Sequence, residues 1–147
     1  MTRMLLLGTF SLALMGCAEP FIVVSGGELS GEVTDAPSDW SAVRDVQVIQ
    51  IETRPDDPYS VNIWMAVVGP DLYIATGEND TNWTEHLAEN RDTRARIDGV
   101  IYELEASAVT QSAEHERVVV EYVRKYDDLD MGDNWVMRGQ VFRLDRR

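Results

Sequence analysis

Strand patterns joined by short turns run through most of this chain, and they constrain its fold more than any other feature. Several segments alternate apolar and polar residues, which is the period of a half-buried strand. Gly69-Pro70-Asp71 and Asp98-Gly99 are turn sequences, and each joins two such segments into a hairpin. We therefore expect strands at residues 29–33, 46–53, 59–68, 72–76, 93–97, 100–109 and 135–144.

A short helix is expected at residues 83–90. Thr81 and Asn82 precede it, and either residue type suits the N-cap position. Trp83 and Leu87 are one helical turn apart, so both are expected to pack inward.

A longer helix is expected at residues 112–126. Acidic residues lie near its start and basic residues near its end, as the helix dipole favours. Its apolar residues keep helical spacing and are Val118, Val119, Tyr122, Val123 and Tyr126. Hairpins interrupted by only two helices favour a mainly β, α+β fold built on an antiparallel barrel over a doubly wound sheet.

The composition is that of one folded domain that draws its stability from its core. The chain has 147 residues, 44% of them hydrophobic, and a single cysteine, so no disulfide can form within it. Arg3 is the only charged residue before position 17, which leaves 26 acidic and 12 basic side chains and a net charge of −14. Because phosphates bind to cationic surfaces, this charge argues against nucleic acid and anionic lipid headgroups as partners.

The first sixteen residues resemble a bacterial lipoprotein signal peptide. Arg3 precedes an apolar run at residues 5–14, which is too short to span a bilayer and has the length of a secretory h-region. Leu14-Met15-Gly16-Cys17 then resembles a lipobox, which implies cleavage before Cys17 and acylation of that cysteine. An ordinary cleaved secretory signal with a nearby cysteine is the alternative.

The resemblance divides the chain into three parts: a signal peptide at residues 1–16, a lipidated tether at residues 17–27 and a domain at residues 28–147. Ala18, at the second position of the mature chain, implies sorting to the outer membrane, with the domain on the periplasmic side. We therefore expect a protein that is anchored to a membrane without crossing it.

The order of turns and apolar positions over residues 45–126 matches that of a known family. Strands at 49–53, 59–68 and 72–76 are followed by a helix ending at Asn90 and a strand at 93–97. This pattern resembles the pyridoxamine 5′-phosphate oxidase-like, FMN-binding split barrels. The resemblance implies a six-stranded antiparallel split β-barrel that forms a homodimer and binds a flavin, a deazaflavin or haem at the subunit interface.

The resemblance also implies which residues would line a cofactor. They are Asn62, Trp64, Thr76, Asn79 and Trp83. Flavin-binding members hold the flavin phosphate with Arg or Lys in this region, whereas residues 59–82 contain neither, and Glu78 and Asp80 would repel a phosphate. The arginines that follow could reach the phosphate, or be solvated or paired with acids; they are Arg91, Arg94 and Arg96.

Few other residues suggest a metal-binding, cofactor-binding or ligand-binding role. Neither His86 nor His115 has the sequence spacing of a metal site, and His86 is interpreted as a helix-surface residue or a haem ligand. Residues 127–134 hold four aspartates, which suit an acidic connecting loop or a calcium site. The tryptophans suit the core or an interface, or could line a ligand pocket; they are Trp40, Trp64, Trp83 and Trp135.

Two functions of different classes follow from these observations. The first is a binding module that holds a small ligand in a cleft at the dimer interface without catalysis. The second is a flavin- or deazaflavin-dependent oxidoreductase. A purely structural envelope protein is a third interpretation, and the sequence leaves open whether the protein is an enzyme.

Overall fold

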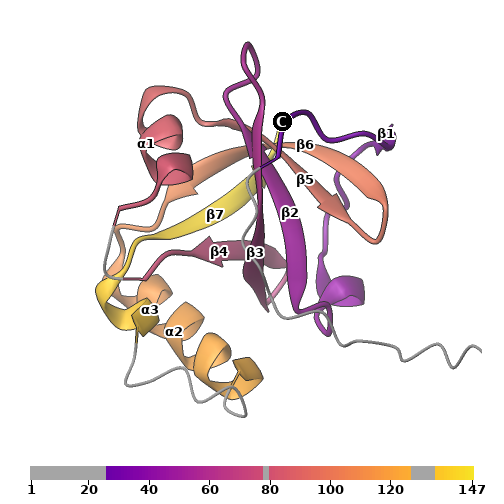
Figure 1. Cartoon of the computed structure of the whole chain (residues 1–147). Helices are drawn as coiled ribbons and strands as arrows, with labels where there is room; N and C mark the ends of the chain where they lie inside the picture. Colours follow the sequence, from indigo (N-terminus) through magenta and orange to yellow (C-terminus); the bar gives the residue numbers. More distant parts are fainter. Residues whose placement is uncertain (1–25, 78–79, 127–134) are drawn as a thin grey trace, which may run out of the picture.

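Six strands close into an antiparallel barrel, and a short seventh strand lies on its outside (Figure 1). The computed structural model describes residues 26–77, 80–126 and 135–147. The barrel order is β6-β5-β2-β3-β4-β7, and pairing of β6 with β7 completes the ring. The strands are β1 (Glu32–Thr34), β2 (Val48–Thr53), β3 (Tyr59–Val68), β4 (Asp71–Ala75), β5 (Asp92–Ile97), β6 (Val100–Ala108) and β7 (Val141–Arg146). The helices are α1 (Asn82–Glu89), α2 (Ser112–Tyr126), α3 (Trp135–Arg138) and a 3₁₀ turn at Ser41–Val43.

The interior of the barrel is filled by alternate residues of its strands. On β3, Val61, Ile63 and Met65 are buried inside, as the period of two predicts. Trp83 and Leu87 of α1 enter the same cluster, so this helix closes one end of the barrel. The predicted six-stranded α+β split barrel is therefore confirmed.

A second apolar cluster joins α2 to the outside of the barrel. Ala66 of β3 and Tyr73 of β4 point away from the interior and pack against Val118 and Tyr122 of α2. The Tyr122 hydroxyl donates a hydrogen bond to the carbonyl oxygen of Trp64 at 2.9 Å. Figure 1 shows α2 and α3 together on the side of the barrel away from α1. The outward faces of β3 and β4 are thus covered by a helix.

The C-terminal turn of α2 is held by carbonyl oxygens at the start of β2 and on β3. The Tyr126 hydroxyl lies 2.7 Å from the carbonyl oxygens of both Gln47 and Met65. Lys125 Nζ donates to the carbonyl oxygens of Val46 at 2.5 Å and Met65 at 3.0 Å. Burial of the amine lowers the pKa of Lys125 to about 8, more than the nearby acids raise it.

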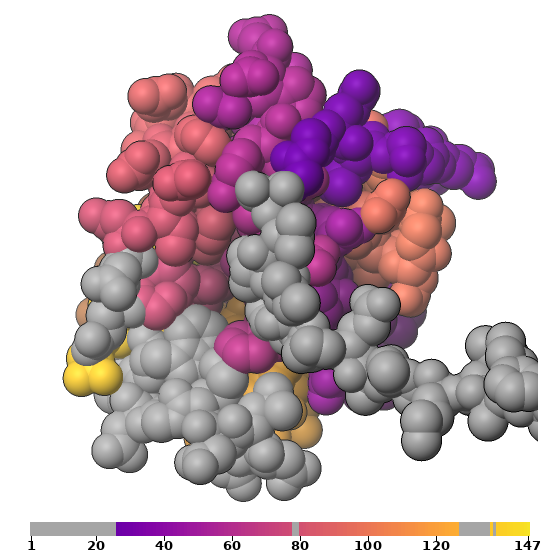
Figure 2. Space-filling view, viewed as in Figure 1, coloured from indigo at the N-terminus to yellow at the C-terminus, as the bar shows by residue number. Residues whose placement is uncertain are grey.

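The segment that precedes β1 is attached to the barrel at several points. Gly26 and Ser60 exchange two backbone hydrogen bonds of 2.7 and 3.0 Å. Arg96 of β5 donates to the carbonyl oxygen of Ser30 at 2.9 Å, and β1 then runs parallel to β6. Figure 2 shows this indigo segment lying against the orange β5–β6 part of the surface. The described chain is thus attached to the barrel from Gly26, its first residue.

The predicted strands and helices need three corrections. Residues 135–144 were expected to form one strand, but α3 occupies Trp135–Arg138 and β7 begins only at Val141. The first extended segment is β1 at Glu32–Thr34, because Leu29 instead turns its side chain into a buried position. On α2, Val123 was placed on the apolar face and is 48% exposed, since it lies at the margin of the face that meets the barrel.

No helix among the described residues combines the length and apolarity of a membrane span. Within the same residues, no three His, Cys, Asp or Glu side chains gather as a metal site would require. The acidic segment 127–134, the cleavage site and Cys17 lie outside the described residues, so the predictions about calcium and lipidation stay predictions.

Candidate functional site

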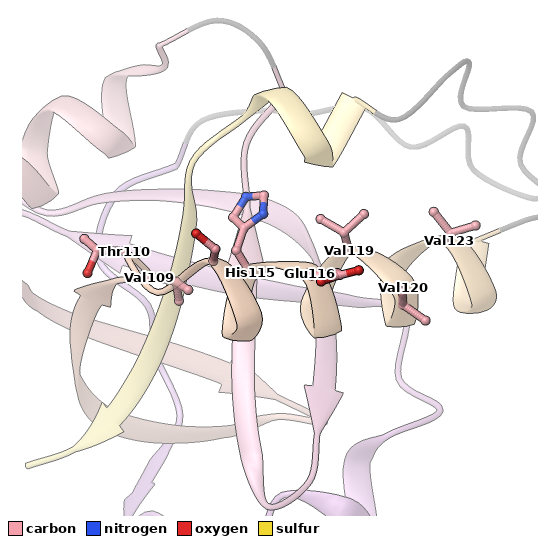
Figure 3. Close-up of a pocket in the computed structure, with 8 residues that line it drawn as sticks. Val109, Thr110, His115, Glu116, Val119, Val120 and Val123 are labelled. Atoms are coloured by element: carbon pink, nitrogen blue, oxygen red, sulfur yellow. The ribbon is translucent and has the colours of Figure 1, made fainter.

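A half-open groove of about 690 Å³ runs along the outward side of α2 (Figure 3). This volume falls within the range of about 300–1,000 Å³ that is usual for small-molecule sites. The connection from β6 to α2 forms one rim, and α2 forms the rest. The lining residues are Val109, Thr110, Ser112, His115, Glu116, Val119, Val120 and Val123.

The groove has an apolar lining because α2 carries more apolar residues than its contact with the barrel buries. Val118 and Tyr122 face β3 and β4, whereas Val119 sits at the edge of the buried face. Val120 and Val123 point away and are 63% and 48% exposed. Single exposed valines are common, but three neighbouring valines that line one groove form a small apolar surface.

Four polar residues line the groove beside these valines, and they are Thr110, Ser112, His115 and Glu116. The His115 ring is half buried, and the structure gives it no hydrogen-bond partner among the described residues. Figure 3 shows the ring projecting from α2 on the side where α3 lies, whereas Val120 points to the opposite side. Because a neutral imidazole both donates and accepts hydrogen bonds, His115 can orient a polar group of an otherwise apolar ligand.

The position of α2, and therefore of the groove, is fixed at the N-terminal end of the helix. The Tyr73 hydroxyl donates to Glu114 Oε1 at 2.9 Å, and Arg143 Nη1 donates to the same oxygen at 2.9 Å. Burial, helped by the Glu114 hydrogen bond, raises the pKa of Tyr73 to about 12. Arg143 also pairs with Asp145 at 2.6 Å, so β4, β7 and α2 are joined by one network.

The groove holds groups for binding but no assembled catalytic pair. Ser112 and His115 both line it, yet no hydrogen bond between their side chains is present in the part of the chain that the structure describes. A nucleophilic hydroxyl needs a base within about 2.6–3.2 Å to be activated.

Of the five residues predicted to line a cofactor, the structure describes four, which lie in three different places. Asn62 and Trp64 share the outward face of β3, and the Trp64 ring packs on Tyr126 with centroids 5.6 Å apart. Thr76 is buried after β4, where its hydroxyl donates to the carbonyl oxygen of Gly77. The Trp83 ring lies inside the barrel against Phe142, and Asn79 lies outside the described residues.

The residues of β3, β4 and α1 do not fit a flavin phosphate. From residue 55 to residue 90 the sequence contains no Lys or Arg. A phosphate dianion needs charge-assisted donors, and the charged side chains of this stretch are all acidic. Arg94 cannot supply the missing charge freely, because it lies 3.0 Å from the Glu52 carboxylate. Of the three alternatives that the sequence left open for Arg94, the structure shows pairing with an acid.

His86 contacts the barrel and not a cavity of its own. Its Nδ1 lies 2.9 Å from Thr53 Oγ1, and its ring packs edge-to-face on Tyr59 with centroids 5.0 Å apart. These contacts attach α1 to β2 and β3. The half-buried ring therefore has a structural explanation that requires no haem.

No family model and no curated protein matches this chain in sequence. Solved structures do match in fold. A conserved hypothetical protein from Mycobacterium tuberculosis superposes with a TM-score of 0.57 at 18% identity, covering 80% of this chain and 86% of the other. An FAD-binding protein from Mesorhizobium loti gives 0.54 at 13%, covering 71% and 84%.

A candidate pyridoxamine 5′-phosphate oxidase from Listeria innocua gives a TM-score of 0.53 at 18% identity, covering 69% of this chain and 84% of the other. The chain has the pyridoxamine 5′-phosphate oxidase-like split-barrel fold. At these identities the likeness concerns the fold alone. What the site can bind therefore depends on this chain's own residues.

The α2 groove was not predicted from the sequence. The run Val118-Val119-Val120 contains the signal, because three consecutive apolar residues cannot all face one surface of a helix. A surplus valine on an amphipathic helix indicates a second, smaller apolar face. Which valine is surplus depends on how α2 sits on the barrel.

Proposed function

We propose that this protein is a lipid-anchored binding protein of the bacterial envelope that holds a small, mainly apolar ligand in the α2 groove. The main support for this proposal is the groove itself, which measures about 690 Å³ and is lined by four valines. The His115 ring, which has no hydrogen-bond partner within the described residues, supplies a polar contact. Glu116 at the rim would disfavour an acidic ligand, so the expected ligand is neutral or cationic.

The anchoring part of the proposal comes from the N-terminal sequence. Acylated Cys17 would hold the barrel on the periplasmic side of the outer membrane, and the tether from Cys17 to Gly26 spans at most about 30 Å when extended. The groove would then stay close to the membrane, where apolar molecules concentrate. This location supports an apolar ligand over a charged one.

A flavin-dependent oxidoreductase is the alternative, and the FAD-binding protein from Mesorhizobium loti with the same fold favours it. The cation-free stretch from residue 55 to residue 90 counts against it. An absorbance spectrum of the purified full chain distinguishes the two proposals. A flavin band in the visible region that persists through dialysis would replace the binding proposal with the redox one.

The binding proposal is tested with a neutral fluorescent probe, N-phenyl-1-naphthylamine. We expect saturable binding of the probe to the full chain, weakened at least tenfold by Val120→Asp. Val33→Asp is the matched control, because Val33 is 52% exposed on β1 and does not line the groove. Equal weakening by both variants, or no saturable binding to the wild type, would overturn the proposal.

A further inference from the structure

A second, smaller groove of about 420 Å³ lies between α2 and the turn that joins β3 to β4. Its lining residues are Arg44, Val67, Val68, Gly69, Glu116, Arg117, Val120 and Glu121. We call it the arginine groove, because two arginines line it and none lines the α2 groove. Glu116 and Val120 line both grooves, and Figure 3 shows Val120 pointing away from the side of α2 that carries His115.

The turn before β2 places Arg44 in the arginine groove. The backbone N–H of Trp40 donates to the carbonyl oxygen of Pro70 at 3.0 Å, and the Trp40 side chain is buried in the barrel core. Arg44 directly follows the 3₁₀ turn that begins after Trp40, so its backbone is held beside the β3–β4 turn. Gly69 of that turn has a φ of 60° and adds no side chain to the groove.

Arg44 and Arg117 differ from the other arginines that the structure describes. Neither side chain has an ion pair or a hydrogen bond to another described residue, whereas each of the other described arginines has a partner. Arg44 is only partly exposed. A guanidinium presents its N–H donors in a planar fork that matches a carboxylate. Two such forks with no acceptor thus line one groove.

The two acids of the arginine groove are not equivalent. Glu121 pairs with Arg124 at 2.6 Å, and its side chain is only 13% exposed. Hydrogen bonds from Arg124 lower the pKa of Glu121, and the charge of Arg44 adds to this effect. Glu116 is exposed and has no ion pair among the described residues. The groove therefore offers two guanidinium groups and one carboxylate that no other described side chain engages.

These charges favour a zwitterion over a simple ion. An anion would be repelled by Glu116 and by the net charge of −13, and a cation would be repelled by the two arginines. A ligand with one carboxylate and one ammonium group meets an opposite charge at both ends and carries no net charge. Val68 and Val120 add apolar surface beside these groups.

We infer that the arginine groove binds a free α-amino acid with an apolar side chain. Arg44 and Arg117 would hold its carboxylate, and Glu116 would hold its ammonium group. Its side chain would contact Val68 and Val120. The volume is at the small end of the usual range for ligand sites, which suits so small a molecule. This inference goes beyond the proposed function and does not rest on a ligand in the α2 groove.

The test on the wild type compares L-leucine with two analogues, by NMR titration of the full chain. N-acetyl-L-leucine lacks the ammonium group, and L-leucinamide lacks the carboxylate. We expect saturable binding of leucine and at least tenfold weaker binding of each analogue. Leucinamide is a cation, so general attraction to this acidic chain would favour it over leucine. A preference for leucine therefore reports the arginines, and equal binding of leucine and leucinamide would overturn the inference.

O-phosphoethanolamine tests for a different source of the same charges. It resembles a zwitterionic lipid headgroup and has no apolar side chain. We expect it to bind more weakly than leucine. Tighter binding than that of leucine would overturn the assignment to an amino acid.

Three variants test the roles of the charged residues. Arg44→Gln and Arg117→Gln should each weaken leucine binding at least fivefold. Glu116→Gln should reduce the preference for leucine over N-acetyl-leucine from at least tenfold to within twofold, because the variant no longer attracts the ammonium group. An unchanged preference in Glu116→Gln would overturn the inference.

Arg91→Gln is the matched control, because it removes the same charge from an arginine that is 64% exposed and lies outside the groove. It should bind leucine within twofold of the wild type, and a loss equal to that in Arg117→Gln would overturn the inference. The naphthylamine probe carries neither an ammonium nor a carboxylate group. Failure of that probe to bind would therefore remove the proposed ligand of the α2 groove and leave the leucine result standing.

Discussion

Arg94 on β5 lies 3.0 Å from the carboxylate of Glu52 on β2, and this pair is set into the side of the barrel under the N-terminal segment. Glu52 is only 3% exposed, and its second oxygen accepts the backbone N–H of Leu29. One carboxylate thus joins two neighbouring strands to the segment that precedes β1. This contact adds to those that Gly26 and Ser30 of the same segment make with the barrel.

Replacing Glu52 with Ala should therefore destabilise the domain. The change leaves the half-buried Arg94 guanidinium and the Leu29 N–H without their acceptor, and losing one partner of a buried pair typically costs several kcal/mol. Because Arg94 keeps some contact with water, we expect a loss of about 2–3 kcal/mol in the free energy of unfolding, measured by urea denaturation.

Glu32→Ala is the matched control, since Glu32 is an exposed acid on β1, and it should change the free energy of unfolding by less than about 0.5 kcal/mol. Limited proteolysis adds a local readout, because the N-terminal segment should be cleaved faster in Glu52→Ala. An unfolding free energy equal to that of Glu32→Ala would show that the pair contributes nothing.

Gly139 stands at a position where no side chain fits. A Cβ atom there would overlap the carbonyl oxygen of Thr76 and lie 2.6 Å from that of Gly77. Gly139→Ala must therefore shift the backbone where β7 meets the end of β4, at a cost of about 1–3 kcal/mol. We expect the melting temperature to fall by roughly 5–10 °C.

The control for this substitution is Gly27→Ala. A Cβ at Gly27 meets no atom within 4 Å, so the melting temperature should stay within about 2 °C of the wild type. If both variants melt alike, the close approach of Gly139 to Thr76 does not exist in solution.

The half-buried amine of Lys125 should make stability depend on pH. Its pKa falls from the ordinary 10.5 to about 8 on folding, because burial disfavours the charged form. Between about pH 8 and pH 10 the unfolded chain binds more protons at this residue than the folded chain does. Stability should therefore rise with pH in that window.

Above about pH 10 the direction reverses. The pKa of Tyr73, Tyr122 and Tyr126 is raised by burial in the folded state, so these phenols ionise first in the unfolded chain and favour it. Urea denaturation from about pH 7 to about pH 9.5 should thus show an increase that disappears in Lys125→Met. An identical slope in that variant would assign the pH dependence to another group.

The sequence predicted the barrel well because its signals are local. Asp98 and Gly99 both have positive φ, 50° and 85°, which is the geometry that an Asp-Gly hairpin turn favours. A period of two along β3 predicts that three buried residues share one face, and they are Val61, Ile63 and Met65. Thr81 is the N-cap of α1, as expected, and joins Thr84 in reciprocal capping contacts.

The predictions that were wrong, and the features that were not predicted, have physical reasons as well. A helix of four residues such as α3 is too short to show helical spacing, so Trp135 and Val136 resembled the start of a strand. The α2 groove depends on which side of the helix meets β3 and β4, and that choice is made by contacts distant in sequence. Asn62 and Trp64 could be placed on one strand face. The spacing of Trp83 and Leu87 predicted that both pack inward, and both lie in the core, whereas the placement of Trp83 beside a cofactor came from the family resemblance alone.

Cys17 should decide where the protein is found in the cell. If its thiol carries the acyl chains, Cys17→Ala removes the anchor and the cleavage signal together, since both depend on the cysteine. We expect the wild type to sediment with outer membranes and to leave them only in detergent. Labelling with radioactive palmitate should mark the wild type alone.

The ordinary secretory alternative gives the opposite result. A simple signal peptide would be removed without acylation, so both forms would be recovered in the soluble periplasmic fraction and neither would take up label. Cys17→Ser serves as a second variant, because it retains the size and polarity of the side chain but cannot form the thioether. Membrane association of both variants at the wild-type level would show that something other than Cys17 holds the barrel at the membrane.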